Sequence, residues 1–152
     1  MRALEGETYR SPRVLVVEDE PRIARGLQSA LTELGFNEVY LAHDLLMGQA
    51  LLLLRPPELG ILDVHIGRDL VFPLAAEFRA KLIPIIFSTS DAASKLPPEW
   101  STNPIVGKPL NIEALSAALG AVGFAHRVSG KTAEPFGWRL DGANSSGRRP
   151  PT

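Results

Sequence analysis

The 152-residue sequence predicts an α/β fold in which helices cover both faces of a parallel sheet. Short apolar runs alternate along the chain with stretches whose apolar residues recur every three or four positions. Hydrophobic residues make up 45% of the chain and charged residues 22%, which is ordinary for a folded protein of about one domain. We therefore expect one doubly wound domain built around a single sheet.

Five apolar runs are predicted to form strands: residues 14–17, 38–41, 59–62, 83–87 and 105–106. Four stretches with helical periodicity lie between or after them: residues 21–34, 45–54, 71–81 and 112–122. The first run is entirely aliphatic, as in a strand that is buried on both faces. Pro21 suits the first turn of the helix that follows it, and Gly35 is a typical helix stop.

The later elements carry similar local signals. Asp44 and Asn111 precede helical stretches and are expected to cap them. Residues 71, 74 and 78 are expected to face inward from the third helix, and residues 112, 115, 119 and 122 from the last. Where a regular repeat would place another long helix, residues 91–104 contain three prolines and leave room for one or two turns at most. The fourth helix is therefore expected to be shortened or irregular.

Composition excludes several classes of protein. Sixteen basic and 17 acidic residues give a formal net charge of −1, so no global field attracts nucleic acid or an anionic membrane. The absence of cysteine excludes disulfides and thiolate metal sites. The longest aliphatic run, residues 50–54, is far below the roughly 18 residues of a membrane span. We expect a soluble cytoplasmic protein with no signal peptide and no membrane contact.

The two ends of the chain differ from its centre. Helical periodicity stops after residue 124, and the following 28 residues are rich in glycine, proline, serine and basic side chains. We expect a flexible N-terminal extension at 1–10, one domain at 11–124 and a disordered C-terminal tail at 125–152.

Polar side chains follow the carboxyl ends of successive predicted strands. Glu18 and Asp19 follow the first strand, Asp63 the third, Thr89 the fourth and Lys108 the fifth. If the strand order is 2-1-3-4-5, the first and third strands are neighbours, so Asp19 and Asp63 would face each other at the sheet edge where such folds bind ligands. Crowded carboxylates favour a cation, and Mg²⁺ prefers oxygen ligands.

Four short motifs occur at these strand ends in a fixed order: VLVVEDE at 14–20, ILDV at 61–64, PIIFSTS at 84–90 and GKP at 107–109. With them the chain resembles, over residues 11–123, the receiver domain of two-component response regulators, of the stand-alone type without an output domain. The resemblance implies a flavodoxin-like (βα)5 fold with strand order 2-1-3-4-5.

The same resemblance implies roles for the site residues. Asp63 would accept a phosphoryl group, while Lys108 and the Thr89 hydroxyl would each bond a phosphoryl oxygen. Asp19 and Asp63 would bind Mg²⁺ directly. A carboxylate that attacks a phosphoryl group meets charge repulsion, which a cation and a lysine relieve. The lysine–proline bond after Gly107 is commonly cis in such domains.

Two further groups complete the implied metal site and the implied partners. Glu18 would hold a metal-bound water, and the backbone carbonyl of His65 would be the remaining protein ligand. The phosphoryl donor would be a sensor histidine kinase or a histidine phosphotransfer protein. The signal would pass by binding an unknown downstream protein, or the chain would act as a phosphate sink; no DNA-binding domain is expected.

Two other functions remain open. Receivers usually carry Tyr or Phe three residues before the lysine, where this chain has Ile105, so a pseudo-receiver that binds partners without phosphorylation is one alternative. A Mg²⁺-dependent phosphatase of the haloacid-dehalogenase type also uses a strand-end aspartate, but it typically needs an acid where this chain has His65. Nucleotide-binding glycine motifs and a nucleophile-elbow serine are absent from the sequence.

Overall fold

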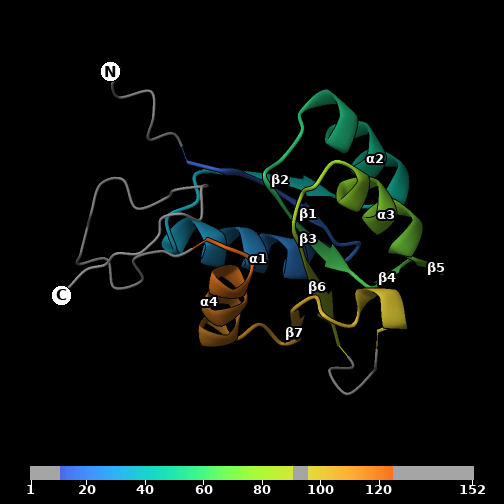
Figure 1. The fold of residues 1–152 in the computed structure, drawn as a ribbon. Helices are drawn as coiled ribbons and strands as arrows, with labels where there is room; N and C mark the ends of the chain where they lie inside the picture. Colours follow the sequence, from blue (N-terminus) through green and yellow to red (C-terminus); the bar gives the residue numbers. More distant parts are fainter. Residues whose placement is uncertain (1–10, 91–95, 125–152) are drawn as a thin grey trace.

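The computed structural model describes residues 11–90 and 96–124 (Figure 1). The expected N-terminal extension at 1–10 and the expected tail at 125–152 lie outside the described residues. The elements in chain order are β1 (Arg13–Val17), α1 (Pro21–Glu33), β2 (Glu38–Ala42), α2 (Leu45–Leu54), β3 (Leu59–Asp63), β4 (His65–Ile66), β5 (Asp69–Leu70), α3 (Phe72–Ala80), β6 (Ile85–Thr89), a single 3-10 turn (Pro98–Trp100), β7 (Ile105–Gly107) and α4 (Ile112–Ala121).

Five strands form one parallel sheet in the order β2-β1-β3-β6-β7. Because β6 and β7 are the fourth and fifth strands of this sheet, the predicted order 2-1-3-4-5 is confirmed. Helices α1 and α4 cover one face, and α2 and α3 cover the other (Figure 1). Strand β1 serves both layers, since Val14 and Val16 pack beneath α1 while Leu15 and Val17 face the opposite core.

The helix caps and the helix-terminating glycine predicted from the sequence are present in the structure. The Asp44 side chain accepts a hydrogen bond from the Met47 amide at 2.7 Å and caps α2. Asn111 caps α4 by accepting from the amides of residues 113 and 114. Gly35 has a φ of 104°, the left-handed conformation that glycine adopts readily after a helix.

Three expectations need correction. Strand β6 covers Ile85–Thr89 instead of 83–87, because Ser88 still pairs with both β3 and β7, and Thr89 still pairs with β7. Residues 65–70, which lie between the third predicted strand and the third predicted helix and for which no strand was predicted, contain a small antiparallel hairpin of β4 and β5. Ile112 was expected to face the core but is 38% exposed, because it lies at the edge of the buried stripe that is centred on Leu115.

The segment before β7 is short, as the prolines predicted. Within residues 96–104 the structure has one 3-10 turn, and Trp100 at its end is buried. The indole stacks on Phe72 and meets Phe87 edge-on, with ring centroids 6.1 and 5.7 Å apart. The Arg79 guanidinium lies 3.7 Å from the centre of the Trp100 ring. Helix α3 and strand β6 thus each supply one aromatic partner for Trp100.

No helix within residues 11–90 and 96–124 has the length and apolar character that a membrane crossing requires.

Candidate functional site

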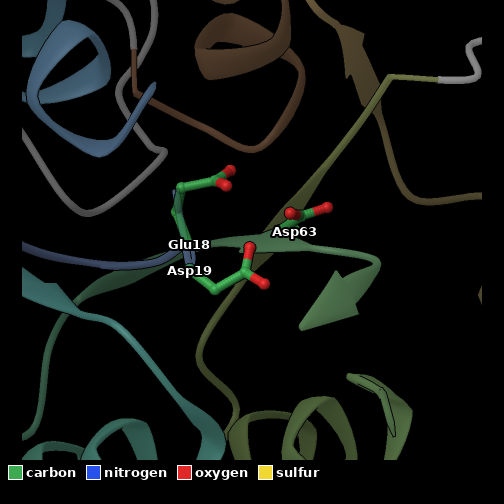
Figure 2. Close-up of side chains that lie close together, drawn as sticks. All are labelled: Glu18, Asp19 and Asp63. Atoms are coloured by element: carbon green, nitrogen blue, oxygen red, sulfur yellow. The ribbon is translucent and has the colours of Figure 1, made fainter. Parts of the chain in front are cut away.

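The carboxyl ends of β1 and β3 bring three carboxylates together, as Figure 2 shows. Glu18 and Asp19 directly follow β1, and Asp63 is the last residue of β3. The register pairs Val17 with Leu62, so the residues that follow them, Glu18 and Asp63, lie side by side at the end of the sheet. One oxygen from each carboxylate lies within 4.8 Å of the others. Glu18 and Asp63 are buried, whereas Asp19 is exposed to solvent.

Lys108 places a positive charge between the two buried carboxylates. Its Nζ atom lies 2.9 Å from Glu18 Oε1 and 2.9 Å from Asp63 Oδ2. The backbone amide of Lys108 donates to the carbonyl of Thr89 at 3.1 Å, which ties the lysine to the end of β6. The Lys108–Pro109 peptide bond is cis, as the family resemblance implies. The lysine therefore reaches the acidic cluster from the far side of β6.

Burial governs the electrostatics of this ion-pair network. Burial raises the pKa of the Glu18 carboxyl, and the negative charge of Asp63 adds to this effect, although Lys108 acts in the opposite direction. Burial alone would lower the pKa of the Lys108 ammonium, but Glu18 and Asp63 outweigh it, so that pKa lies above its usual value. The lysine is consequently held in its charged form between its partners.

The exposed carboxylate is fixed by the hairpin that sequence reasoning missed. The Gly67 amide donates to Asp19 Oδ2 at 2.7 Å. Gly67 begins the two-residue loop between β4 and β5 with a φ of 64°, which a glycine adopts at little cost. A glycine at the first position of a two-residue loop was the available signal. At the hairpin's start, the His65 amide donates to Asp63 Oδ1 at 3.3 Å, and the His65 side chain is exposed.

Thr89 and Ile105 lie on the strands beyond Asp63. Ser88 is the register partner of Asp63, and Thr89, one residue further along β6, is buried at the same end of the sheet. Ile105 is half-buried on β7 and pairs in register with Phe87. Glu18, Asp19, Asp63 and Lys108 are therefore in one cluster, with Thr89 at the neighbouring strand end.

The donor set fits a hard divalent cation. All three clustered side chains offer carboxylate oxygens, which Mg²⁺ prefers. Glu18 Oε2 accepts a hydrogen bond from the Glu20 amide, and the buried Oε1 lies 2.9 Å from the Lys108 ammonium. A buried oxygen with lone pairs left over is suited to a cation or to a water bound to one.

Comparison with known proteins identifies the fold. No protein-family model matches the sequence, and a search of curated proteins finds no match. Among solved structures, SdrG from Sphingomonas melonis Fr1 is 27% identical with a TM-score of 0.67, and the match covers 74% of this chain and 96% of SdrG. The receiver domain of PhyR from Erythrobacter litoralis is 21% identical with a TM-score of 0.67, covering 76% of this chain and 92% of that domain.

One structural neighbour is a longer protein, of which this chain matches only a part. The response regulator PhyR from Brucella abortus is 25% identical with a TM-score of 0.62, and the match covers 77% of this chain. It covers only 50% of that PhyR chain, so the chain corresponds to about half of the longer protein. The sheet order, the acidic strand ends and these neighbours agree: the chain has the fold of a response-regulator receiver domain.

Proposed function

We propose that this chain acts as a response-regulator receiver domain that accepts a phosphoryl group on Asp63 in a Mg²⁺-dependent reaction. The donor is a phosphohistidine on a sensor kinase or a phosphotransfer protein. The observation that carries the proposal is the position of Asp63, a nearly buried carboxylate at a sheet end between an ammonium and two further carboxylates.

The residues present suit this transfer. An oxygen of the Asp63 carboxylate forms a bond to phosphorus while the bond from phosphorus to the donor imidazole nitrogen breaks, and the leaving imidazole takes up a proton. Bound Mg²⁺ would neutralise charge on the phosphoryl oxygens, and Asp19, Asp63, Glu18 and the His65 carbonyl are the groups proposed to hold it. Lys108, whose raised pKa keeps it charged, is suited to pair with a phosphoryl oxygen.

We propose that phosphorylation of Asp63 changes the conformation of the segment before β7 through Thr89 and Trp100. The Thr89 hydroxyl can donate to a phosphoryl oxygen that is present only after transfer. Two residues earlier on β6, Phe87 contacts the Trp100 ring, so a shift of the strand end reaches the segment before β7. Receivers usually have an aromatic ring at the position of Ile105. In this chain we propose that the Trp100 ring responds to phosphorylation instead. In its shifted position, the segment before β7 would bind a downstream protein. Alternatively, the chain serves as a phosphate sink and passes no signal.

Ile105 also favours a second candidate, a pseudo-receiver that binds its partner without phosphorylation. The two candidates differ in whether Asp63 is modified at all. The haloacid-dehalogenase alternative has less support, because the position of its second acid is occupied by His65, whose side chain points to solvent.

Acetyl phosphate with Mg²⁺, followed by intact-mass analysis, tests the proposal. We expect a gain of about 80 Da, the mass of one phosphoryl group, that is lost in EDTA and in Asp63→Asn. Asp69→Asn is the matched control, because it removes an exposed carboxylate from the neighbouring hairpin and should leave the gain intact. An unmodified wild-type chain would favour the pseudo-receiver, and a gain that survives Asp63→Asn would reject the site.

A further inference from the structure

Helix α2 has an apolar face that nothing in the described chain covers. Its ten residues, LLMGQALLLL, include a single polar side chain. The four largest side chains on the outward side are exposed by 76% at Leu46, 41% at Met47, 58% at Leu53 and 76% at Leu54. Helix α2 lies at the periphery of the molecule beside α3 (Figure 1).

These side chains form one continuous face. At about 100° of rotation per residue, Leu46, Met47, Leu53 and Leu54 all project within about 60° of the direction of Ala50. Gly48 and Leu52 project on the opposite side and are buried against the sheet and α3. Ala50 is therefore the centre of the exposed apolar face, and its small side chain allows another helix to approach closely.

Polar groups bound this face on one side and at both ends of the helix. The amide of Gln49 bonds both carboxylate oxygens of Glu77 on α3, at 3.3 and 3.0 Å, which closes that side. The exposed groups at the helix ends carry opposite charge: Asp44 caps the N-terminus, and Arg55 follows the C-terminus, held by the Tyr40 hydroxyl at 2.9 Å.

Two pairs of these residues lie symmetrically about the middle of the helix. Counted from the middle of α2, between Gln49 and Ala50, Asp44 and Arg55 lie at equal distances, and so do Leu46 and Leu53. In an antiparallel pair of α2 helices, Asp44 of each copy would meet Arg55 of the other, and Leu46 would meet Leu53. The helix dipoles would also oppose each other favourably. A self-complementary pattern of this kind is what a two-fold interface requires.

We infer that α2 is a self-association surface, which pairs with α2 of a second copy of this chain about a two-fold axis near Ala50. The four apolar side chains are 41–76% exposed, so their pairing would remove apolar surface from water, over an area smaller than the roughly 800 Å² per partner of a standard interface. An interface of this size forms a reversible dimer.

Sedimentation velocity of the full chain tests the association. At about 100 μM, which exceeds the micromolar Kd typical of a small interface, we expect a dimer that dissociates on dilution. Leu46→Glu and Leu53→Glu should each give monomer at every concentration, because a buried unpaired charge is costly. Leu82→Glu is the matched control: Leu82 is 89% exposed outside α2, so this variant should dimerise like the unchanged protein. A monomeric wild type, or a Leu46→Glu dimer, would overturn the inference.

Disulfide trapping tests the geometry, because the chain contains no cysteine. Ala50→Cys places one thiol at the proposed axis, where two copies approach closely enough to cross-link under mild oxidation. Glu33→Cys places a thiol on the exposed side of α1 as the control. We expect a covalent dimer from Ala50→Cys and monomer from Glu33→Cys; equal cross-linking of the two variants would contradict the assignment to α2.

Discussion

Replacing Asp63 with asparagine removes one negative charge from the carboxylate cluster and leaves the shape of the side chain nearly unchanged. In the absence of metal, Asp63 lies within 4.8 Å of carboxylate oxygens from Glu18 and Asp19, and 2.9 Å from the Lys108 ammonium. Whether the charge of Asp63 stabilises or destabilises the fold depends on which of these interactions is larger.

Coulomb's law gives the balance. With an effective dielectric constant of about 20, a repulsion at 4.8 Å costs about 3.5 kcal/mol for each carboxylate, and the attraction at 2.9 Å contributes about 6 kcal/mol. The attraction and the two repulsions nearly cancel, so the desolvation of Asp63, which is only 6% exposed, decides the sign. We expect Asp63→Asn to raise the free energy of unfolding by about 1 kcal/mol in EDTA, which is about 4 °C in Tm for a domain of this size.

Thermal unfolding followed by circular dichroism measures this change. Mg²⁺ should stabilise the unchanged protein by binding the folded state, and it should stabilise Asp63→Asn less, since one ligand is lost. Asp69→Asn, which lies outside the cluster, should leave Tm and its response to Mg²⁺ unchanged. A lower Tm for Asp63→Asn in EDTA would show that the ion pair with Lys108 outweighs repulsion and burial, and would refute this reasoning.

Two further predictions concern packing and signalling. A Cβ atom at Gly60 would lie within 2.8 Å of two Phe78 ring carbons, so Gly60→Ala should lower the free energy of unfolding by about 2 kcal/mol in urea titration. At Gly26, on the exposed side of α1, an added Cβ would meet no atom within 4 Å apart from its chain neighbours and the helix's own backbone, so Gly26→Ala should instead raise the free energy of unfolding by about 0.5–1 kcal/mol. A stabilised Gly60→Ala together with a destabilised Gly26→Ala would contradict the described packing. Beryllofluoride with Mg²⁺ should increase protection from hydrogen exchange between residues 89 and 100, and change little in 112–122. A response concentrated in the last helix would reject the proposed route through Trp100.

The fold was predictable because its signals are local. Strands buried on both faces must be continuously apolar, and the run at 14–17 can therefore be recognised without knowledge of its partners. Helix caps act within three residues, so Asp44 and Asn111 could be assigned from the sequence. The proximity of Asp19 and Asp63 followed from strand order alone, since parallel neighbours end at the same edge of a sheet.

Apart from the short pairing of β4 with β5, the contacts that were missed join residues far apart in the chain. Strands β4 and β5 have two residues each, too few for any periodicity, and the Gly67–Asp19 hydrogen bond that holds them spans 48 residues. The ion pair of Lys108 with Glu18 likewise required the sheet to be assembled first. The fourth strand was predicted to end at residue 87, before the hydroxyl residues, but the pairing of Ser88 with β3 and β7 and of Thr89 with β7 extends it.

The central claim, that Asp63 accepts the phosphoryl group, is tested most directly by locating the modification itself. An acyl phosphate is reduced by borohydride, which converts a phosphorylated aspartate to homoserine and leaves free carboxylates unchanged. After reaction with acetyl phosphate and Mg²⁺, reduction and peptide mass spectrometry, we predict homoserine at position 63 and aspartate at positions 19 and 69. Homoserine at either of those positions, or at none, would contradict the assignment of Asp63 as the phosphoacceptor.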